Sequence, residues 1–144
     1  MSGPDLAVED YLAQRGRMKL LDAVLQVDAQ QAVSSSVVTK DWPLLNEPGG
    51  VSPIVIVELV AQTAGVSIRW QEMQEPGGRE KSGGGLIVGI KEAVFHVPGI
   101  QLDSRIITWA GKRHSFASYS EYQGHCKIGQ LKLGEATIQV VRTE

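Results

Sequence analysis

The chain has 144 residues, with 14 lysines and arginines against 16 aspartates and glutamates, and a formal net charge of −2. This length predicts a single domain, residues 1–144, and the balanced charge gives no basis for nucleic-acid binding. The lone thiol of Cys126 cannot form an internal disulfide, which favours a reducing, cytoplasmic setting. The N-terminal segment lacks the apolar core of a secretory signal. The longest apolar stretch, 54–66, is interrupted by polar residues and is shorter than the roughly 20 residues of a membrane span, so no membrane association is expected.

The first third of the chain predicts a short helix followed by two strands. Residues 5–14 place Leu and Tyr among acidic residues and suggest a short amphipathic helix. Residues 18–27 alternate roughly between apolar and polar and predict a strand, and 31–39, rich in Val, Ser and Thr, predict its hairpin partner. The segment 42–52, with two prolines and two glycines, predicts turns.

The next segment, 53–74, is ambiguous at its start, because β-branched residues dominate it and favour a strand. Three features favour a helix instead. Ser52 followed by Pro53 is typical of an N-cap and a first helical residue. The stretch is also too long for an ordinary strand, and its polar residues recur at helical spacings. These residues are Glu58, Gln62, Arg69 and Glu72. We therefore predict a buried central helix at about 53–74.

The second half of the chain has the pattern of strands. A glycine-rich loop is expected at 75–85. Strand-like runs follow at 86–97, 106–111, 116–122 and 131–141. The turn signals between them are Pro98-Gly99, Gly111-Lys112, Gly124 and Gly129.

This order of elements predicts an α+β fold in which an antiparallel sheet of about six strands wraps around one long central helix. A single open sheet leaves an unpaired edge, which a dimer would cover. The glycine-rich segments match no phosphate-binding loop, and no Cys/His spacing matches a metal site. No cofactor and no metal are therefore expected.

Three segments, in the same order, resemble the β-hydroxyacyl-acyl carrier protein dehydratases of the hotdog superfamily. Residues 12–22 (LAQRGRMKLLD) resemble the opening motif of that family, and 56–64 (IVELVAQTA) resemble the start of its central helix. Residues 86–95 (LIVGIKEAVF), followed by 97–99 and Leu102, resemble a later strand motif. The resemblance implies a dimeric hotdog fold. It also implies binding of acyl thioesters, carried by acyl carrier protein or coenzyme A, in fatty acid or polyketide-type metabolism.

The family that the chain resembles uses a histidine and a glutamate or aspartate for proton transfer. It uses the backbone N–H of a glycine near the helix start to stabilise charge on the thioester oxygen. Glu58 stands at the acidic position and is the expected catalytic residue. Burial on the helix would favour the protonated carboxyl, which suits a proton donor.

The other positions of the family site carry different residues here. Counting back about 14 residues from Glu58 places Leu44 at the position of the family's histidine. Gln14 replaces the histidine of the opening motif, and Pro53, which has no N–H, stands at the glycine position. Gln62 could contact substrate or form a structural hydrogen bond to the backbone. These four residues are the candidate substrate-binding positions.

The histidines that are present, His96, His114 and His125, match no catalytic position of that family. We therefore expect an acyl-thioester-binding hotdog protein with altered catalysis. In a heterodimer, a second hotdog chain would supply the histidine while Glu58 supplies the acid. A homodimer is the alternative assembly.

Three other functions stay open at this point. The chain could be a thioesterase in which Glu58 activates water or attacks the carbonyl. It could be an active dehydratase with a displaced base, His96 or Asp41. It could also be a structural subunit whose acyl tunnel is filled by large side chains. The candidates for filling the tunnel are Leu44, Trp42 and Trp70.

An acyl carrier protein is a plausible partner because such carriers are acidic. Two small basic clusters could receive it, although ordinary solvated surface charge explains them equally well. The first consists of Arg15, Arg17 and Lys19, and the second of Lys112 and Arg113.

Overall fold

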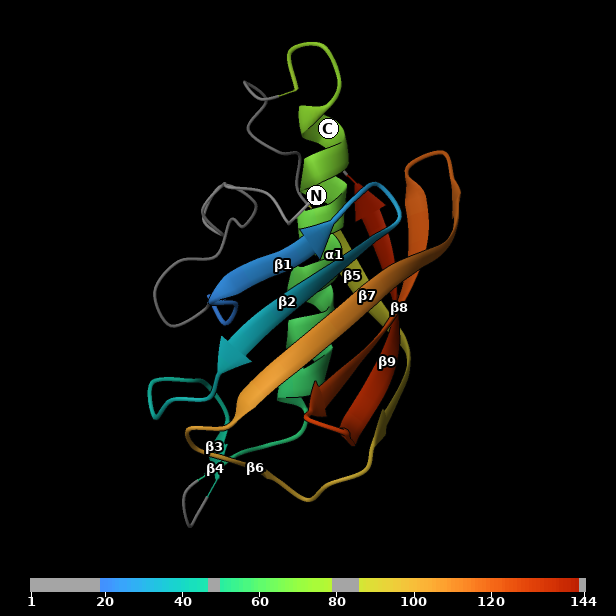
Figure 1. Cartoon of the computed structure of the whole chain (residues 1–144). Helices are drawn as coiled ribbons and strands as arrows, with labels where there is room; N and C mark the ends of the chain where they lie inside the picture. Colours follow the sequence, from blue (N-terminus) through green and yellow to red (C-terminus); the bar gives the residue numbers. More distant parts are fainter. Residues whose placement is uncertain (1–18, 47–49, 79–85, 143–144) are drawn as a thin grey trace.

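The computed structural model describes residues 19–46, 50–78 and 86–142, and the helix predicted at 5–14 lies outside these ranges (Figure 1). One long helix and nine strands follow one another in the described part of the chain. In order they are β1 (Ala23–Val27), β2 (Gln31–Val37), β3 (Leu45–Asn46), β4 (Gly50–Val51), α1 (Val55–Met73), β5 (Leu86–Phe95), β6 (Ile100–Gln101), β7 (Arg105–Phe116), β8 (Tyr119–Ile128) and β9 (Leu131–Arg142).

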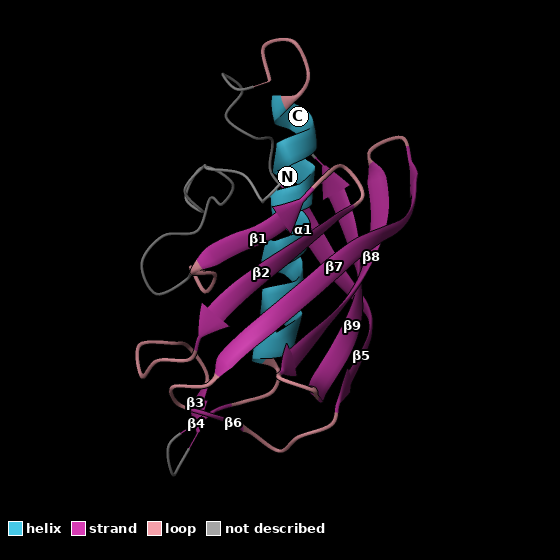
Figure 2. Cartoon of the chain, in the orientation of Figure 1, coloured by secondary structure: helices cyan, strands magenta, loops and turns pink. Residues whose placement is uncertain are grey.

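Six strands form an antiparallel sheet in the order β1-β2-β7-β8-β9-β5, which curves around α1 (Figure 2). The short strands β3, β4 and β6 form a second sheet beside the N-terminal end of α1. The predicted arrangement of about six strands around one helix is confirmed. The small sheet was not predicted, because the two-residue strands β3 and β4 lie in the segment 42–52, whose prolines and glycines favour turns, and β6 directly follows the turn signal Pro98-Gly99.

The strands alternate between a face that packs on α1 and a face turned away from it. In β9, Ala136, Ile138 and Val140 are buried against the core. In β2, Ala32 and Ser34 face the helix, and the Ser34 hydroxyl lies 2.8 Å from the hydroxyl of Thr63 on α1. The side-chain period of two in the strands therefore places one continuous apolar layer under the helix.

Two glycines in the sheet let α1 approach it closely. A Cβ atom on Gly124 of β8 would lie 2.6 Å from the carbonyl oxygen of Trp109 on β7 and 2.7 Å from Val60 of α1. One on Gly134 of β9 would lie 2.5 Å from the carbonyl oxygen of Val94 on β5 and 2.9 Å from Ile56 of α1. Contacts this short would force the helix or the sheet to move. The position of α1 over β8 and β9 therefore depends on the absence of these two side chains.

The structure corrects the turns that the sequence predicted at Gly111 and Gly124. Gly124 and Gly111 were expected to mark turns, but both lie inside long strands, so the runs predicted at 106–111 and 116–122 belong to β7 and β8. The reversal occurs instead at 117–118, where Ala117 has a left-handed backbone with a φ of 54°. Gly124 serves close packing rather than a turn.

The helix begins two residues later than predicted. Ser52 was expected to be its N-cap and Pro53 its first residue, but α1 starts at Val55, and Ile54 occupies the N-cap position. Ser52 caps the preceding turn, because its Oγ accepts the Ile54 N–H at 3.3 Å. The capping chemistry is therefore present, although it acts on the turn that leads into the helix.

We predict that Gly124→Ala destabilises the protein by about 1–3 kcal/mol, the usual cost of an added group in a packed core. Gly65→Ala is the matched control, because Gly65 lies in α1 and a Cβ there meets no atom within 4 Å. It should be neutral or stabilising by about 0.5–1 kcal/mol, from helix propensity. Urea denaturation of both variants measures this difference. Equal stabilities would show that α1 is not seated on Gly124.

Candidate active site

Glu58 lies in the first turn of α1, on the flank of the helix that the sheet leaves uncovered. Its neighbours along this flank are apolar. Ile54 is 55% exposed, and Val57 and Ala61 are partly buried. We call the stripe formed by Ile54, Val57, Glu58 and Ala61 the open flank. A carboxyl group that is half-buried among apolar side chains can meet a ligand or a second chain without crossing the core.

Gln62 fixes the orientation of the Glu58 carboxyl group. Its side chain is 2% exposed, and its Oε1 accepts the backbone N–H of Leu20 at 3.1 Å. This contact directs Nε2 of Gln62 toward Glu58, where it donates to Oε2 at 2.9 Å. Because Oε2 accepts this hydrogen bond, Oε1 of Glu58 is the oxygen left for a ligand.

The start of α1 has little left to donate to a ligand. The N–H of Ile54 donates to the Ser52 hydroxyl, and that of Val55 donates to the carbonyl oxygen of Ser52 at 3.1 Å. The next two N–H groups, of Ile56 and Val57, donate to the carbonyls of Pro53 and Ile54. Pro53 itself has no N–H. Within residues 53–57, no backbone N–H is therefore available to hold a thioester oxygen.

The position expected for the family's histidine lies in the segment before β3. Leu44 is 49% exposed and has a left-handed backbone with a φ of 64°, which is uncommon for a residue other than glycine or asparagine. Its carbonyl accepts the N–H of Ser52 at 2.8 Å, so the segment is fastened to the residues that precede α1. Leu44 therefore lies at the surface near the start of the helix and does not fill the core.

The other side chains expected near the substrate have different surroundings. Trp42 is buried in the core, and Trp70 is partly buried against it. Gln14 lies outside the described residues. Of the three side chains proposed to fill a tunnel, Trp42 alone is fully enclosed.

The three histidines have partners away from Glu58. His114 Nε2 lies 3.6 Å from Glu121, and His96 Nε2 lies 3.7 Å from Glu135. The ring of His125 packs on that of Trp109, with centroids 5.3 Å apart, and burial together with nearby Lys127 lowers its pKa. Asp41, the other proposed base, is exposed, and its backbone N–H donates to Thr39. None of these contacts includes Glu58.

Other reactive groups in the described residues offer no second centre. Burial raises the pKa of the Cys126 thiol to about 12, so it stays protonated at neutral pH. No group of three or more His, Cys, Asp or Glu in the described ranges is arranged to hold a metal ion. No helix in these ranges is long and apolar enough to cross a membrane.

The basic pair expected at Lys112 and Arg113 is split between the two faces of the sheet. Lys112 Nζ donates to Gln71 of α1 at 3.2 Å, whereas Arg113 donates to Gln123 on the opposite face at 3.0 Å. The two charges therefore do not form one cluster. Arg15 and Arg17 of the other cluster lie outside the described residues.

Comparison with known proteins assigns the chain to a family. The sequence profile of the ApeP-like family, described as ApeP dehydratase, matches residues 6–144. The chain belongs to the ApeP-like dehydratase family. The sequence matches none of the curated proteins.

Solved structures similar to this ApeP-like chain share its fold. The dehydratase heterocomplex ApeI:P from Xenorhabdus doucetiae matches with a TM-score of 0.85 and 19% identity, covering 98% of this chain and 93% of that one. A hypothetical thioesterase with coenzyme A from Streptococcus pneumoniae matches with a TM-score of 0.61 and 12% identity, covering 84% of each chain. The protein smu.793 from Streptococcus mutans, bound to acetyl CoA, matches with a TM-score of 0.67 and 11% identity, covering 92% and 96%. The expected hotdog fold is confirmed.

Sequence reasoning identified Gln62 but missed the residue that anchors it. Of the two roles expected for Gln62, a substrate contact or a structural hydrogen bond to the backbone, the hydrogen bond is confirmed, because its Oε1 accepts the Leu20 N–H while its Nε2 donates to Glu58. The spacing of four residues gave a signal for the Glu58–Gln62 pair, because such residues share a helix face. Nothing in the sequence gave a signal for Leu20, which is 42 residues away from Gln62.

We predict that Gln62→Leu destabilises the chain by about 1–3 kcal/mol, because it leaves the buried Leu20 N–H without an acceptor. Glu58→Gln should be close to neutral, because its side-chain carbonyl can still accept the Gln62 donor. Thermal or urea unfolding of the two variants tests this difference. A neutral Gln62→Leu would contradict the assignment of Gln62 as the anchor.

Proposed function

We propose that this chain binds fatty or polyketide-type acyl thioesters and contributes Glu58 to a composite dehydratase site, for which a second hotdog chain supplies the histidine. One observation carries the proposal. The carboxyl group of Glu58 is aimed by Gln62 at the open flank, and its described partners include no histidine, lysine or arginine. A group that is positioned but has no proton-transfer partner in the described part of the chain suits half of a shared site.

Dehydration of a β-hydroxyacyl thioester needs two proton transfers. A base takes the proton from C2, the C2–H electron pair forms the double bond, and the C3–O bond breaks. The departing hydroxyl takes a proton and leaves as water. In this proposal the partner's histidine is the base and Glu58 is the acid. Since Oε2 accepts from Gln62, the transferred proton would be carried on Oε1.

Stabilisation of the thioester oxygen must then come from elsewhere. The N–H groups of residues 54–57 all donate within the chain, and Pro53 has none to offer. A donor from the partner chain, together with its histidine, would meet this need. The departures at Leu44 and Pro53 thus support the same division of roles.

The edge of the sheet supports a partner of the same fold. In the order of the described strands, β5 is a terminal strand. Ile90 of β5 pairs with the buried Ile138, which places it on the helix-facing side of the sheet, yet it is 60% exposed. A second hotdog sheet added at this edge would cover Ile90. The similarity to a dehydratase heterocomplex supports a partner of different sequence. An acyl carrier protein remains a proposed thioester donor.

A thioesterase is the second candidate function. Glu58 is the one oriented carboxylate on the open flank, and a carboxylate that activates water or attacks the thioester carbonyl requires no histidine. Two of the similar structures are described with coenzyme A or acetyl CoA, one of them as a hypothetical thioesterase. Hydrolysis would release a free thiol, which separates the two functions experimentally.

The test measures turnover of crotonyl and 3-hydroxybutyryl thioesters, and of a longer homologue, by the chain alone and by the chain mixed with a histidine-bearing hotdog dehydratase chain from the same cell. We expect hydration and dehydration in the mixture, reduced by at least about 100-fold in Glu58→Gln, the range typical of a lost general acid. Glu75→Gln is the matched control, because Glu75 is exposed beyond the end of α1.

Each other outcome points to a different function. Hydration by the chain alone, lost in Glu58→Gln, would indicate a dehydratase that needs no partner histidine. Thiol release lost in the same variant would indicate a thioesterase. A mixture whose turnover does not depend on Glu58 would refute the catalytic role proposed for this residue.

A further inference from the structure

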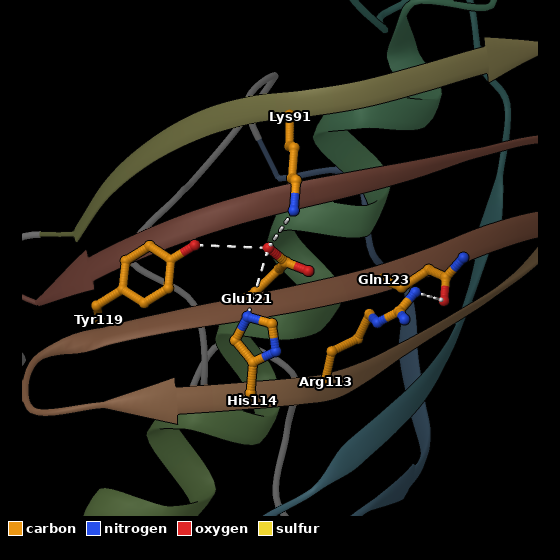
Figure 3. Close-up of polar contacts among 6 residues, drawn as sticks. All are labelled: Lys91, Arg113, His114, Tyr119, Glu121 and Gln123. Carbon is orange, nitrogen blue, oxygen red and sulfur yellow. Dashed lines mark hydrogen bonds and ion pairs between the residues drawn. The ribbon is translucent and has the colours of Figure 1, made fainter.

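On the face of the sheet turned away from α1, one carboxylate gathers groups from three strands (Figure 3). Glu121 of β8 is 4% exposed, although it lies on the outer face. Its Oε1 accepts a hydrogen bond from Lys91 of β5 at 3.2 Å and one from Tyr119 at 3.5 Å. His114 of β7 places Nε2 3.6 Å from the same oxygen. We call these four residues the Glu121 clasp.

The clasp lies between two irregularities in the sheet. The pairing of β5 with β9 shifts between Ile90 and Glu92, which leaves Lys91 as an extra residue. The pairing of β7 with β8 shifts between Lys112 and His114, which leaves Arg113 as another. Both shifts have the form of a β-bulge, which inserts one residue and turns the following side chains over.

Without the bulge in β5, the residues beyond it would have the opposite orientation. Ile90 pairs with Ile138 and Ala93 pairs with Ala136, and both partners are buried under α1. Strict alternation cannot place residues 90 and 93 on one face, because they are three apart. The extra residue, Lys91, resolves this conflict by leaving two consecutive side chains outside. One of them, the Lys91 ammonium, is held by Glu121.

The same bulge lies in the strand that ends the sheet. An edge strand presents unpaired backbone groups, and a bulge there decides which residues can pair with a second chain. Exposed apolar residues continue past the bulge at Val94 and Phe95. A slip of one residue at this edge would exchange the two faces of the added strand.

We propose that the Glu121 clasp fixes the bulged shape of β5 and thereby sets the register in which a second hotdog chain pairs with this edge. The identity of that partner rests on the proposed function, whereas the clasp itself lies within this chain. Lys91 is a positioning residue here, and it acts through the shape of the strand rather than through contact with substrate.

Charge around Glu121 supports this role. The hydrogen bond from Lys91 holds the pKa of the Glu121 carboxyl below its ordinary value, and the charges of Lys91, His114 and Arg113 act in the same direction. From β9, the residue opposite Glu121 is the uncharged Gln139. On the edge strand, Glu92 follows Lys91 and is exposed. The folded chain therefore favours the charged carboxylate.

The sign of the pH dependence follows from that direction. A carboxyl whose pKa is lower in the folded state stabilises the fold above its unfolded pKa, about 4.3 for glutamate. That contribution is lost as the pH falls through the lower folded value. Protection of the β5 amides should therefore be constant near neutral pH and fall in acid. In Glu121→Gln, this acid-dependent step should be absent.

The test compares hydrogen exchange of the peptide covering residues 86–95 in the wild type, Glu121→Gln and Lys91→Met. The control is Lys132→Met, because Lys132 also forms an ion pair, with Glu135, which lies opposite Val94 of the same peptide but outside the bulge at Lys91. We expect exchange in this peptide to rise about tenfold in the two clasp variants, with little change in the melting temperature, because the Lys91 partner is exposed and an ion pair with an exposed partner contributes little global stability. The control should exchange like the wild type.

Association with the histidine-bearing hotdog chain is measured on the same samples. We expect association to be at least about tenfold weaker for both clasp variants. Lys132→Met should associate as tightly as the wild type. Unchanged hydrogen exchange in residues 86–95 of the clasp variants would show that the Glu121 clasp does not hold the bulge in β5. Raised exchange with unchanged association would show that the clasp does not set the register in which the second chain pairs. If the wild type binds no second hotdog chain, the proposed partner fails, and the exchange data still decide whether the clasp holds the bulge.

Discussion

The close contact between α1 and the sheet determines the rest of this structure. Val60 lies over Gly124 and Ile56 over Gly134, at separations that leave no room for a Cβ atom on either glycine. Because that side of the helix packs on the sheet, helical geometry points Glu58 away from the sheet. The open flank is thus a consequence of where the glycines are. Gln62 lies one turn later on the same side of the helix and is enclosed because the backbone at Leu20 contacts it, whereas Glu58 is only half-buried.

Because Gln62 is enclosed, its side chain fixes the orientation of the Glu58 carboxyl group. An amide side chain can usually rotate to exchange its donor and acceptor, but here the Leu20 N–H donates to the amide oxygen of Gln62 and so fixes one orientation. The donor end therefore faces Glu58, and the carboxyl is held at one oxygen and free at the other. This arrangement ties the residues before β1 to the first turns of α1. It also separates a residue that touches substrate in the proposed function, Glu58, from one that positions it.

The sequence predicted the periodic parts of the molecule well and the tertiary contacts poorly. The period-two pattern of β9 and the helical spacing of Glu58, Gln62 and Arg69 are local signals, and both elements are present, although α1 begins two residues later than predicted. The turns predicted at Gly111 and Gly124 were wrong, because a glycine that allows close packing gives the same sequence signal as one that forms a turn. The family resemblance singled out Glu58 as a candidate, whereas the anchoring of Gln62 by Leu20 depends on a contact across 42 residues. The bulge at Lys91 was hidden for a similar reason, since it is defined by pairing with β9.

The surroundings of Glu58 also limit what can cover it. A partner that buried the open flank with apolar side chains alone would remove water from a carboxylate that has one hydrogen bond, and an unpaired buried charge costs several kcal/mol. A stable partner must therefore present a donor near Oε1, leave room for water, or admit a polar substrate group. Ile54, Val57 and Ala61 favour an apolar partner surface around that point. An apolar surface with one donor at its centre is what a hotdog chain carrying a histidine, or the hydroxyl of a β-hydroxyacyl chain, would offer. A positioned carboxylate, with the histidines of the described residues all held elsewhere, therefore supports the proposed shared site over a purely structural interface.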